Sequence, residues 1–115
     1  MSAVLEQIKA AYDDGVAEIN GNKYQFATFV HKERRKVFAF YTKVAPLVEA
    51  NDLSFLDTPE FDAIETLILD KVLLDGSQLS KMPNWLDDYA ADYVMLVMTA
   101  MGVISYPFMQ GSRTA

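Results

Sequence analysis

Apolar side chains recur every three or four positions over most of the chain, which is the spacing of amphipathic helices. The pattern predicts helices over residues 2–12, over residues 32–50, from residue 59 to about residue 73, and from about residue 83 to residue 104. Asp57 or Thr58 is expected to cap the third of these, because a short polar side chain there accepts a hydrogen bond from the first turn.

Two prolines set further expectations. Pro46 removes a hydrogen bond inside the second helical stretch, which predicts a bend or an early end near Val44. Pro107 blocks regular continuation of the last stretch. Residues 111–115 are therefore expected to form a flexible tail.

A different pattern occupies residues 16–29. The dipeptide Asn20-Gly21 suits the positive φ angles of a two-residue hairpin turn, and Tyr24 and Phe26 after it alternate with polar side chains. We therefore predict a short β-hairpin. Because two strands alone are marginal in water, the hairpin is expected to lie on helices or to pair with another chain.

These elements predict a fold that is mainly α with a short N-terminal β-hairpin (α+β), with about four helices. The chain has 115 residues, which suits one compact domain over residues 1–115. The expected core consists of large side chains on the helical stripes: Phe38, Tyr41, Phe61, Ile64, Ile68, Trp85, Tyr89, Val94 and Val97.

Composition narrows the chemistry. The chain has no cysteine, which excludes disulfides, thiolate metal sites and cysteine nucleophiles, and His31 is its only histidine. The five glycines are scattered and form no phosphate-binding loop. We therefore predict no catalytic residue, no metal ligand and no cofactor, and we do not expect an enzyme.

Three acids, Asp87, Asp88 and Asp92, lie near the start of the last helical stretch, where the helix dipole favours negative charge. We expect a solvated acidic face there rather than a site for a divalent ion. The N-terminus lacks the apolar run of a secretory signal, and polar residues interrupt the uncharged residues 93–112. A cytoplasmic protein that is neither secreted nor inserted in a membrane is expected.

Charge is distributed unevenly around a formal net value of −6. Residues 31–36 form a basic turn that includes Arg34, Arg35 and Lys36, whereas acids dominate residues 49–92. The basic turn is expected to pair with acidic helices of this chain or of a neighbour. Patches of opposite sign on one molecule permit head-to-tail association, so these three cations are candidate protein-binding residues in a homo-oligomer.

Two apolar features are further candidates for protein binding. Met95, Met98 and Met101 recur at spacings of three, and flexible thioethers fill irregular cores or adapt to varied partner surfaces. Tyr24 and Phe26 belong to a hairpin with unpaired edges. Core filling and partner binding both remain open for the methionines.

The order of these parts resembles the tail assembly chaperones of long-tailed bacteriophages. The resemblance covers roughly residues 16–104 and is carried by the hairpin INGNKYQF, by the basic-aromatic helix HKERRKVFAFYTKVAPLVE, and by an acidic helical remainder. It implies a non-enzymatic helper that coats the tape-measure protein before the tail tube polymerises around it, with the tail-tube protein as a second partner. It also implies a location in the cytoplasm of the bacterial host and absence from the mature virion.

Two other function classes are considered. A small regulator would use the basic turn of residues 31–36 on DNA or RNA, although most of this acidic chain repels phosphate backbones. A minor structural tail protein would remain in the finished particle.

Overall fold

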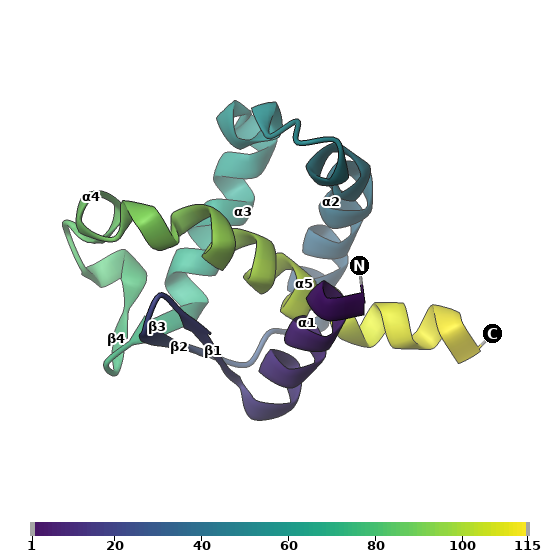
Figure 1. Cartoon of the computed structure of the whole chain (residues 1–115), viewed down its shortest axis with the longest axis horizontal. Coiled ribbons are helices and arrows are strands. Elements are labelled where there is room, and N and C mark those ends of the chain that lie inside the picture. Colours follow the sequence, from purple (N-terminus) through teal and green to yellow (C-terminus); the bar gives the residue numbers. More distant parts are fainter. Residues whose placement is uncertain (1, 115) are drawn as a thin grey trace.

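A computed structural model describes the backbone of residues 2–114 and the side chains of residues 8–108 (Figure 1). The elements follow in this order: α1 (Ser2–Asp14), β1 (Val16–Ile19), β2 (Asn22–Phe26), α2 (His31–Glu49), the 3-10 turn η1 (Ser54–Asp57), α3 (Pro59–Lys71), β3 (Val72–Leu74), β4 (Ser77–Gln78), the 3-10 turn η2 (Leu79–Lys81), α4 (Trp85–Asp88) and α5 (Ala90–Thr114). The predicted class, mainly α with a short N-terminal β-hairpin, is confirmed.

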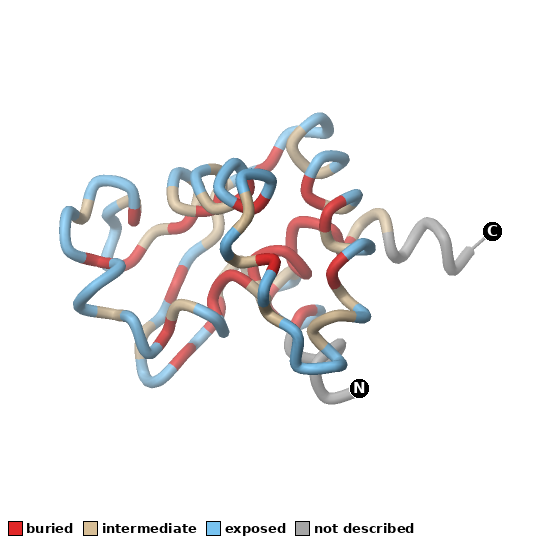
Figure 2. The backbone as a smooth tube through the Cα atoms, turned by 90° about the horizontal axis from the view of Figure 1, so that it is seen from above, coloured by how far each residue is buried: buried red, intermediate tan, exposed pale blue. Residues whose placement is uncertain are grey.

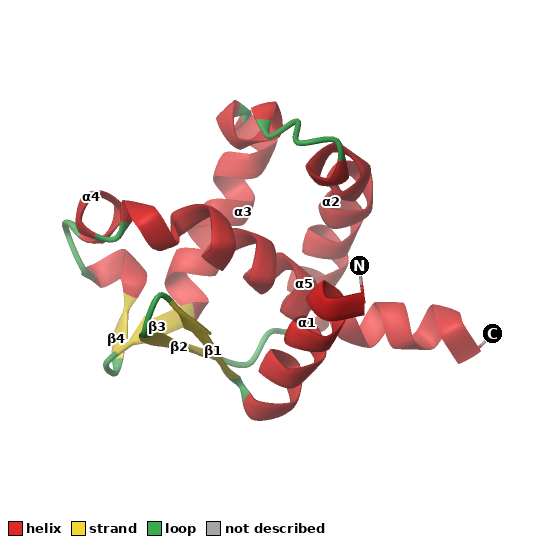
Figure 3. Ribbon diagram, viewed as in Figure 1, coloured by secondary structure: helices red, strands yellow, loops and turns green. Residues whose placement is uncertain are grey.

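The hairpin forms where the Asn-Gly pair predicts it. Asn20 and Gly21 have φ angles of 51° and 85°, and β1 pairs with β2 in antiparallel register, with Ile19 opposite Asn22. β2 then pairs with β3 of the same chain, so the hairpin becomes half of a four-stranded sheet of order β1-β2-β3-β4 (Figure 3).

The second half of this sheet was not expected. Val72 and Leu73, assigned from the sequence to the end of a helix, belong to β3, and Asp75 and Gly76 form a second turn at positive φ angles of 53° and 82°. The prediction was wrong because a three-residue strand has too few positions for alternation to show. The edge of β2, distant in sequence, supplies its hydrogen bonds.

The two long helices, α2 and α5, each contain a proline and continue past it. α2 runs through Pro46 to Glu49, and α5 continues through Pro107 to Thr114, so the early end considered near Val44 and the end expected at Pro107 were both wrong. Each helix therefore continues past a residue that has no backbone N–H to donate. The expected bend near Val44 and the flexibility of residues 111–115 stay predictions; the side chains of that tail lie outside the described residues.

The capping prediction succeeded at α3. The Thr58 hydroxyl accepts a hydrogen bond of 3.2 Å from the backbone N–H of Phe61, and Pro59 occupies the first turn. The last helical stretch differs from its prediction, because it is divided at Tyr89 into the short α4 and the long α5.

α5 is the central element and packs against α1, α2 and α3 (Figure 1). Figure 2 shows the buried segments gathered along it. The stretch Ala90–Phe108 is long and apolar enough to cross a membrane by length and composition alone, and 56% of it is buried inside the protein. Length and apolar composition do not distinguish a membrane span from a central helix that is covered by its neighbours, as α5 is here.

Most of the predicted core is buried. The fully enclosed members are Phe61, Ile64, Ile68, Trp85 and Val97. Phe38, Tyr41 and Tyr89 are partly exposed. Val94 was placed wrongly: its side chain is 39% exposed, because the inward face of α5 passes through Leu96, Val97 and Ala100 instead.

α1 forms a smaller core of its own with α5. Ile8, Ala11 and Ala17 pack there against Val103 and Tyr106. The helices approach closely because position 102 is glycine: a Cβ atom there would lie 2.5 Å from Cδ1 of Ile8.

Candidate protein-binding site

A buried carboxylate joins the hairpin to α5. The Asp92 side chain is 2% exposed and accepts hydrogen bonds from Nδ2 of Asn20 at 2.7 Å, from Nδ2 of Asn22 at 2.8 Å and from the hydroxyl of Tyr24 at 2.5 Å. The expectation that Asp92 belongs to a solvated acidic face with Asp87 and Asp88 was wrong, although the latter two are exposed. Its carboxylate lies one turn before Leu96 and two turns before Ala100, on the inward face of the helix.

The pKa shifts in this cluster suit a structural role. We call Asp92 with its three donors, Asn20, Asn22 and Tyr24, the Asp92 anchor. Burial alone would raise the pKa of Asp92, but the hydrogen bonds from Tyr24, Asn20 and Asn22 outweigh it and hold that pKa below its ordinary value. Burial, reinforced by the hydrogen bond to Asp92, raises the pKa of Tyr24 well above its usual range. The carboxylate is therefore charged, and both of its oxygens accept hydrogen bonds from the hairpin.

Tyr24 is consequently not available to a partner. Its side chain is fully buried and packs edge-on against Trp85, with ring centroids 6.1 Å apart. The prediction that it binds another protein was wrong, because the hydroxyl found an acceptor on α5 that is 68 residues away in sequence. Phe26, the other hairpin candidate, is partly buried and packs against both apolar clusters.

A second tyrosine–carboxylate pair joins α3 to α5. The Tyr93 hydroxyl donates a hydrogen bond to the carboxylate of Glu65. Burial, followed by the contact with Glu65, raises the pKa of Tyr93. Both pairs connect elements and leave no group poised for proton transfer.

The basic turn divides into an inward and an outward part. Nη1 of Arg34 donates a hydrogen bond of 2.9 Å to the backbone carbonyl of Ile104, and its guanidinium lies 5.9 Å from the ring centroid of Phe29. Arg34 is therefore a structural residue. Arg35 and Lys36 are exposed and make no ion pair within residues 8–108, so they remain candidates.

The three methionines of α5 also differ in burial. Met101 is fully buried in the core, Met98 is partly buried against it, and Met95 is 54% exposed. A spacing of three turns each side chain by about 60° relative to the previous one, because an α-helix has 3.6 residues per turn. The row therefore spirals from the surface into the core, and only Met95 presents most of its side chain to a partner.

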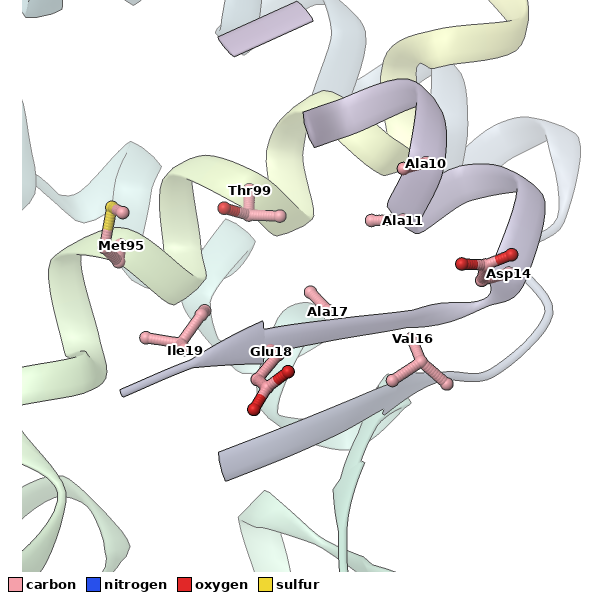
Figure 4. A pocket seen from close by; sticks show the side chains of 9 residues that line it. All are labelled: Ala10, Ala11, Asp14, Val16, Ala17, Glu18, Ile19, Met95 and Thr99. Carbon is pink, nitrogen blue, oxygen red and sulfur yellow. The ribbon is translucent and has the colours of Figure 1, made fainter. Parts of the chain in front are cut away.

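Four large hydrophobic side chains remain exposed in the part of the chain whose side chains are described: Val30, Leu86, Val94 and Met95. Val94 and Met95 are adjacent on α5, and Met95 lines a groove that α5 shares with α1 and β1 (Figure 4). We take Val94, Met95 and this groove as the candidate site.

The acidic side chains of residues 8–108 are spread over several elements. Within that range, no group of three histidine, cysteine, aspartate or glutamate side chains is arranged to hold a metal ion. The exposed Asp87 and Asp88 lie on α4, while Asp92 faces the hairpin.

Comparisons with protein-family models, with curated proteins and with solved structures gave no match to this chain.

Two residues of the Asp92 anchor were missed from the sequence: Asn20 was predicted only as a turn residue, and Asn22 was given no role. One signal could have indicated their role. Asp92 occupies a position on the apolar stripe of α5, and a carboxylate there requires hydrogen-bond donors from the element packed against it.

Proposed function

We propose that this chain is a non-enzymatic tail assembly chaperone of a long-tailed bacteriophage, which binds the tape-measure protein and keeps it soluble before the tail tube polymerises. The observation that supports this most is the exposure of Val94 and Met95 on the central helix, where Met95 also lines a groove. Apolar side chains exposed together on a small protein mark a surface for another polypeptide.

The charge distribution supports a second part of the proposal, head-to-tail association between copies. The start of α2 lies near the C-terminal half of α5, since the rings of His31 and Phe108 are 5.6 Å apart. α4 lies at one end of the long axis, and α2 lies nearer its middle (Figure 1). The exposed Arg35 and Lys36 near the start of α2 form a basic end, and α4 with its exposed Asp87 and Asp88 forms a separate acidic end.

Each charged end also carries an exposed aliphatic side chain. Val30 precedes α2 and is 58% exposed, and Leu86 in α4 is 46% exposed. An apolar contact surrounded by opposite charges is the usual composition of a protein interface. Copies joined in this way would present Met95 and Val94 repeatedly along a long partner.

A pull-down with the tape-measure protein encoded nearby tests the proposal. The two proteins should co-purify, and the tape-measure protein should stay in solution only when this chain is present. Soluble expression of both proteins without association would contradict the proposal. Mass spectrometry of purified particles separates a chaperone, which should be absent, from a minor structural tail protein.

The nucleic-acid alternative depends on the exposed cations of the basic turn. Because Arg34 is engaged with Ile104, Lys32, Arg35 and Lys36 would have to carry such binding. Binding through them should weaken steeply with salt and should be lost on charge reversal. If binding to DNA or RNA persists at high salt, or persists after charge reversal of these residues, the basic turn is not a nucleic-acid site and this alternative is excluded.

A further inference from the structure

β1 has one edge without a neighbouring strand. It lies at the end of the order β1-β2-β3-β4, and its pairing fixes which backbone groups face β2. Ile19 pairs with Asn22 across the two-residue turn, and the carbonyl of Gly15 accepts a hydrogen bond of 2.9 Å from Phe26 N–H. Since hydrogen-bonding direction alternates along a strand, the backbone groups of Val16 and Glu18 face the free edge.

Those edge groups have no partner in the part of the chain that the structure describes. The amide and carbonyl of Val16 and Glu18 take part in none of its turn, loop or side-chain hydrogen bonds. Two outward donors and two outward acceptors on one short strand form a template for one further strand.

A groove of about 200 Å³ lies along this strand, between β1, the end of α1 and α5 (Figure 4). Small or flexible side chains leave the space: Ala10, Ala11, Ala17, Ile19, Met95 and Thr99. Ala17 and Ile19 point toward the helices, whereas Glu18 points to the opposite face of the sheet (Figure 4). A strand added at this edge would direct alternate side chains into the groove.

The charges at the groove are negative. Asp14 lies at one end of it and Glu18 lies in the edge strand. Neither carboxylate makes an ion pair within residues 8–108, although Lys23 is opposite Glu18 in the β1–β2 register. A basic segment would complement them, whereas an acidic one would be repelled.

We propose that the free edge of β1 binds an extended basic segment of another polypeptide as a fifth strand of the sheet. Its small apolar side chains enter the groove beside Met95, and its lysines or arginines lie near Asp14 and Glu18. β-strand addition of this kind takes affinity from backbone hydrogen bonds and specificity from alternate side chains. This site does not depend on the proposed chaperone function, because any protein with such a segment would fit it.

Two other occupants fit less well. A helix cannot satisfy the edge groups of Val16 and Glu18, because its own backbone groups are already paired internally. A second copy paired through β1 would bring the carboxylates of two Asp14 and two Glu18 residues together, and like charges across strands are destabilising.

NMR titration of the 15N-labelled full chain tests the proposal with two capped probe peptides, an alternating lysine–valine pentapeptide and its glutamate–valine counterpart. The basic peptide should shift the amide signals of Val16 and Glu18 and should slow their exchange with solvent. The acidic peptide should bind about tenfold more weakly, which corresponds to the loss of two modest ion pairs and their replacement by repulsion.

Variants at Glu18 separate the backbone contribution from the charge. Glu18→Gln keeps the outward N–H and should weaken binding about threefold. Glu18→Pro also removes that N–H while leaving the bonds to β2, and it should abolish binding. Far-ultraviolet circular dichroism and the signals of β2 check that both variants retain the sheet.

Blocking the groove gives an independent test. Ala10→Phe places an aromatic ring at the exposed wall of the groove and should prevent binding, while Ala39→Phe, at an exposed position on α2, should not. The proposal is overturned if neither peptide changes the Val16 and Glu18 signals, if both peptides bind equally, or if Glu18→Pro binds as well as Glu18→Gln. Protection of the same amides by self-association without peptide would assign the edge to a second copy and would also overturn it.

Discussion

One carboxylate, that of Asp92, holds the hairpin on the central helix. Three side-chain donors from the hairpin converge on it, and it has almost no contact with water. A buried charge of this kind is stable only while its donors remain in place. The position of the hairpin therefore depends on a single side chain of α5.

Replacing Asp92 with asparagine should lower the free energy of unfolding by about 2–3 kcal/mol, because an amide nitrogen would then face donors that need an acceptor. Urea unfolding at pH 7 measures this loss. Asp88→Asn, which changes an exposed carboxylate, should shift the stability by less than about 0.5 kcal/mol. Equal effects of the two substitutions would contradict the anchoring role.

The same carboxylate sets a pH dependence. Its folded-state pKa is depressed below the unfolded value of about 3.9, so its contribution is complete above that value and is lost as the pH falls through the folded pKa. Asp92→Asn should therefore lose less stability than the wild type between pH 5 and pH 2, as followed by acid titration of the unfolding midpoint. If the stability of the wild type and that of Asp92→Asn fall in parallel with pH, the ionised Asp92 carboxylate does not contribute to the pH dependence.

Arg34 should behave unlike its neighbour Arg35. Arg34→Ala removes the charged donor to the Ile104 carbonyl and should cost about 2 kcal/mol of stability. Arg35→Ala should cost less than about 0.5 kcal/mol, because that side chain is exposed and unpaired among the described residues. Thermal unfolding of the two variants under identical conditions distinguishes them, and similar losses would mean that Arg34 has no special structural role.

At the scale of elements, α1 is held to α5 through a close approach at Gly102. A methyl group there would meet Ile8 at 2.5 and 2.9 Å. Gly102→Ala should therefore lower stability by about 1–2 kcal/mol, even though alanine favours helices by about 1 kcal/mol over glycine.

The Ile8→Ala background supplies the control for that prediction. With the isoleucine side chain shortened, Gly102→Ala should become neutral or stabilising. Urea unfolding of the two single variants and the double variant gives the coupling energy, expected to be at least about 1 kcal/mol. Additive effects would show that the two helices do not restrict each other at this point.

Sequence signals predicted elements whose cause is local. The Asn20-Gly21 turn and the Thr58 cap of α3 are examples, since a few neighbouring residues fix the backbone there. β3 and the division of the last helix were missed, because β3 takes its hydrogen bonds from a strand almost fifty residues away.

The candidate site shows the same limit. The sequence made Arg34, Tyr24 and Met101 candidate protein-binding residues, with core filling left open for Met101, whereas the contacts of all three are within the chain. Periodicity does not say which helical face meets which neighbour. Exposed Met95 could be distinguished from buried Met101 only when the orientation of α5 was known.

At the scale of the whole molecule, the basic end of α2, with Arg35 and Lys36, and the acidic end formed by α4 are separate exposed patches of opposite charge. Self-association by these ends should increase with concentration at low salt and should fall in about 0.5 M salt, where screening is strong. Reversing Arg35 and Lys36 to glutamate, or Asp87 and Asp88 to lysine, should abolish it, as measured by sedimentation velocity.

A mixture of these two charge-reversed variants provides the decisive control. In an alternating head-to-tail arrangement every contact then again joins a basic end to an acidic end, so the mixture should associate as the wild type does. Failure of the mixture to associate, with both variants folded, would contradict the head-to-tail arrangement.

The central claim is that Val94 and Met95 are exposed in order to contact another polypeptide. The most direct test is the fraction of the neighbouring tape-measure protein that stays in the supernatant after ultracentrifugation when the two proteins are coexpressed. The wild-type chain should raise this fraction, Val94→Glu with Met95→Glu should return it to the level without the chain, and Ala63→Glu with Thr66→Glu on exposed α3 positions should leave it raised. A supernatant fraction that is the same with the wild type, with the α5 double variant and without the chain would contradict the account.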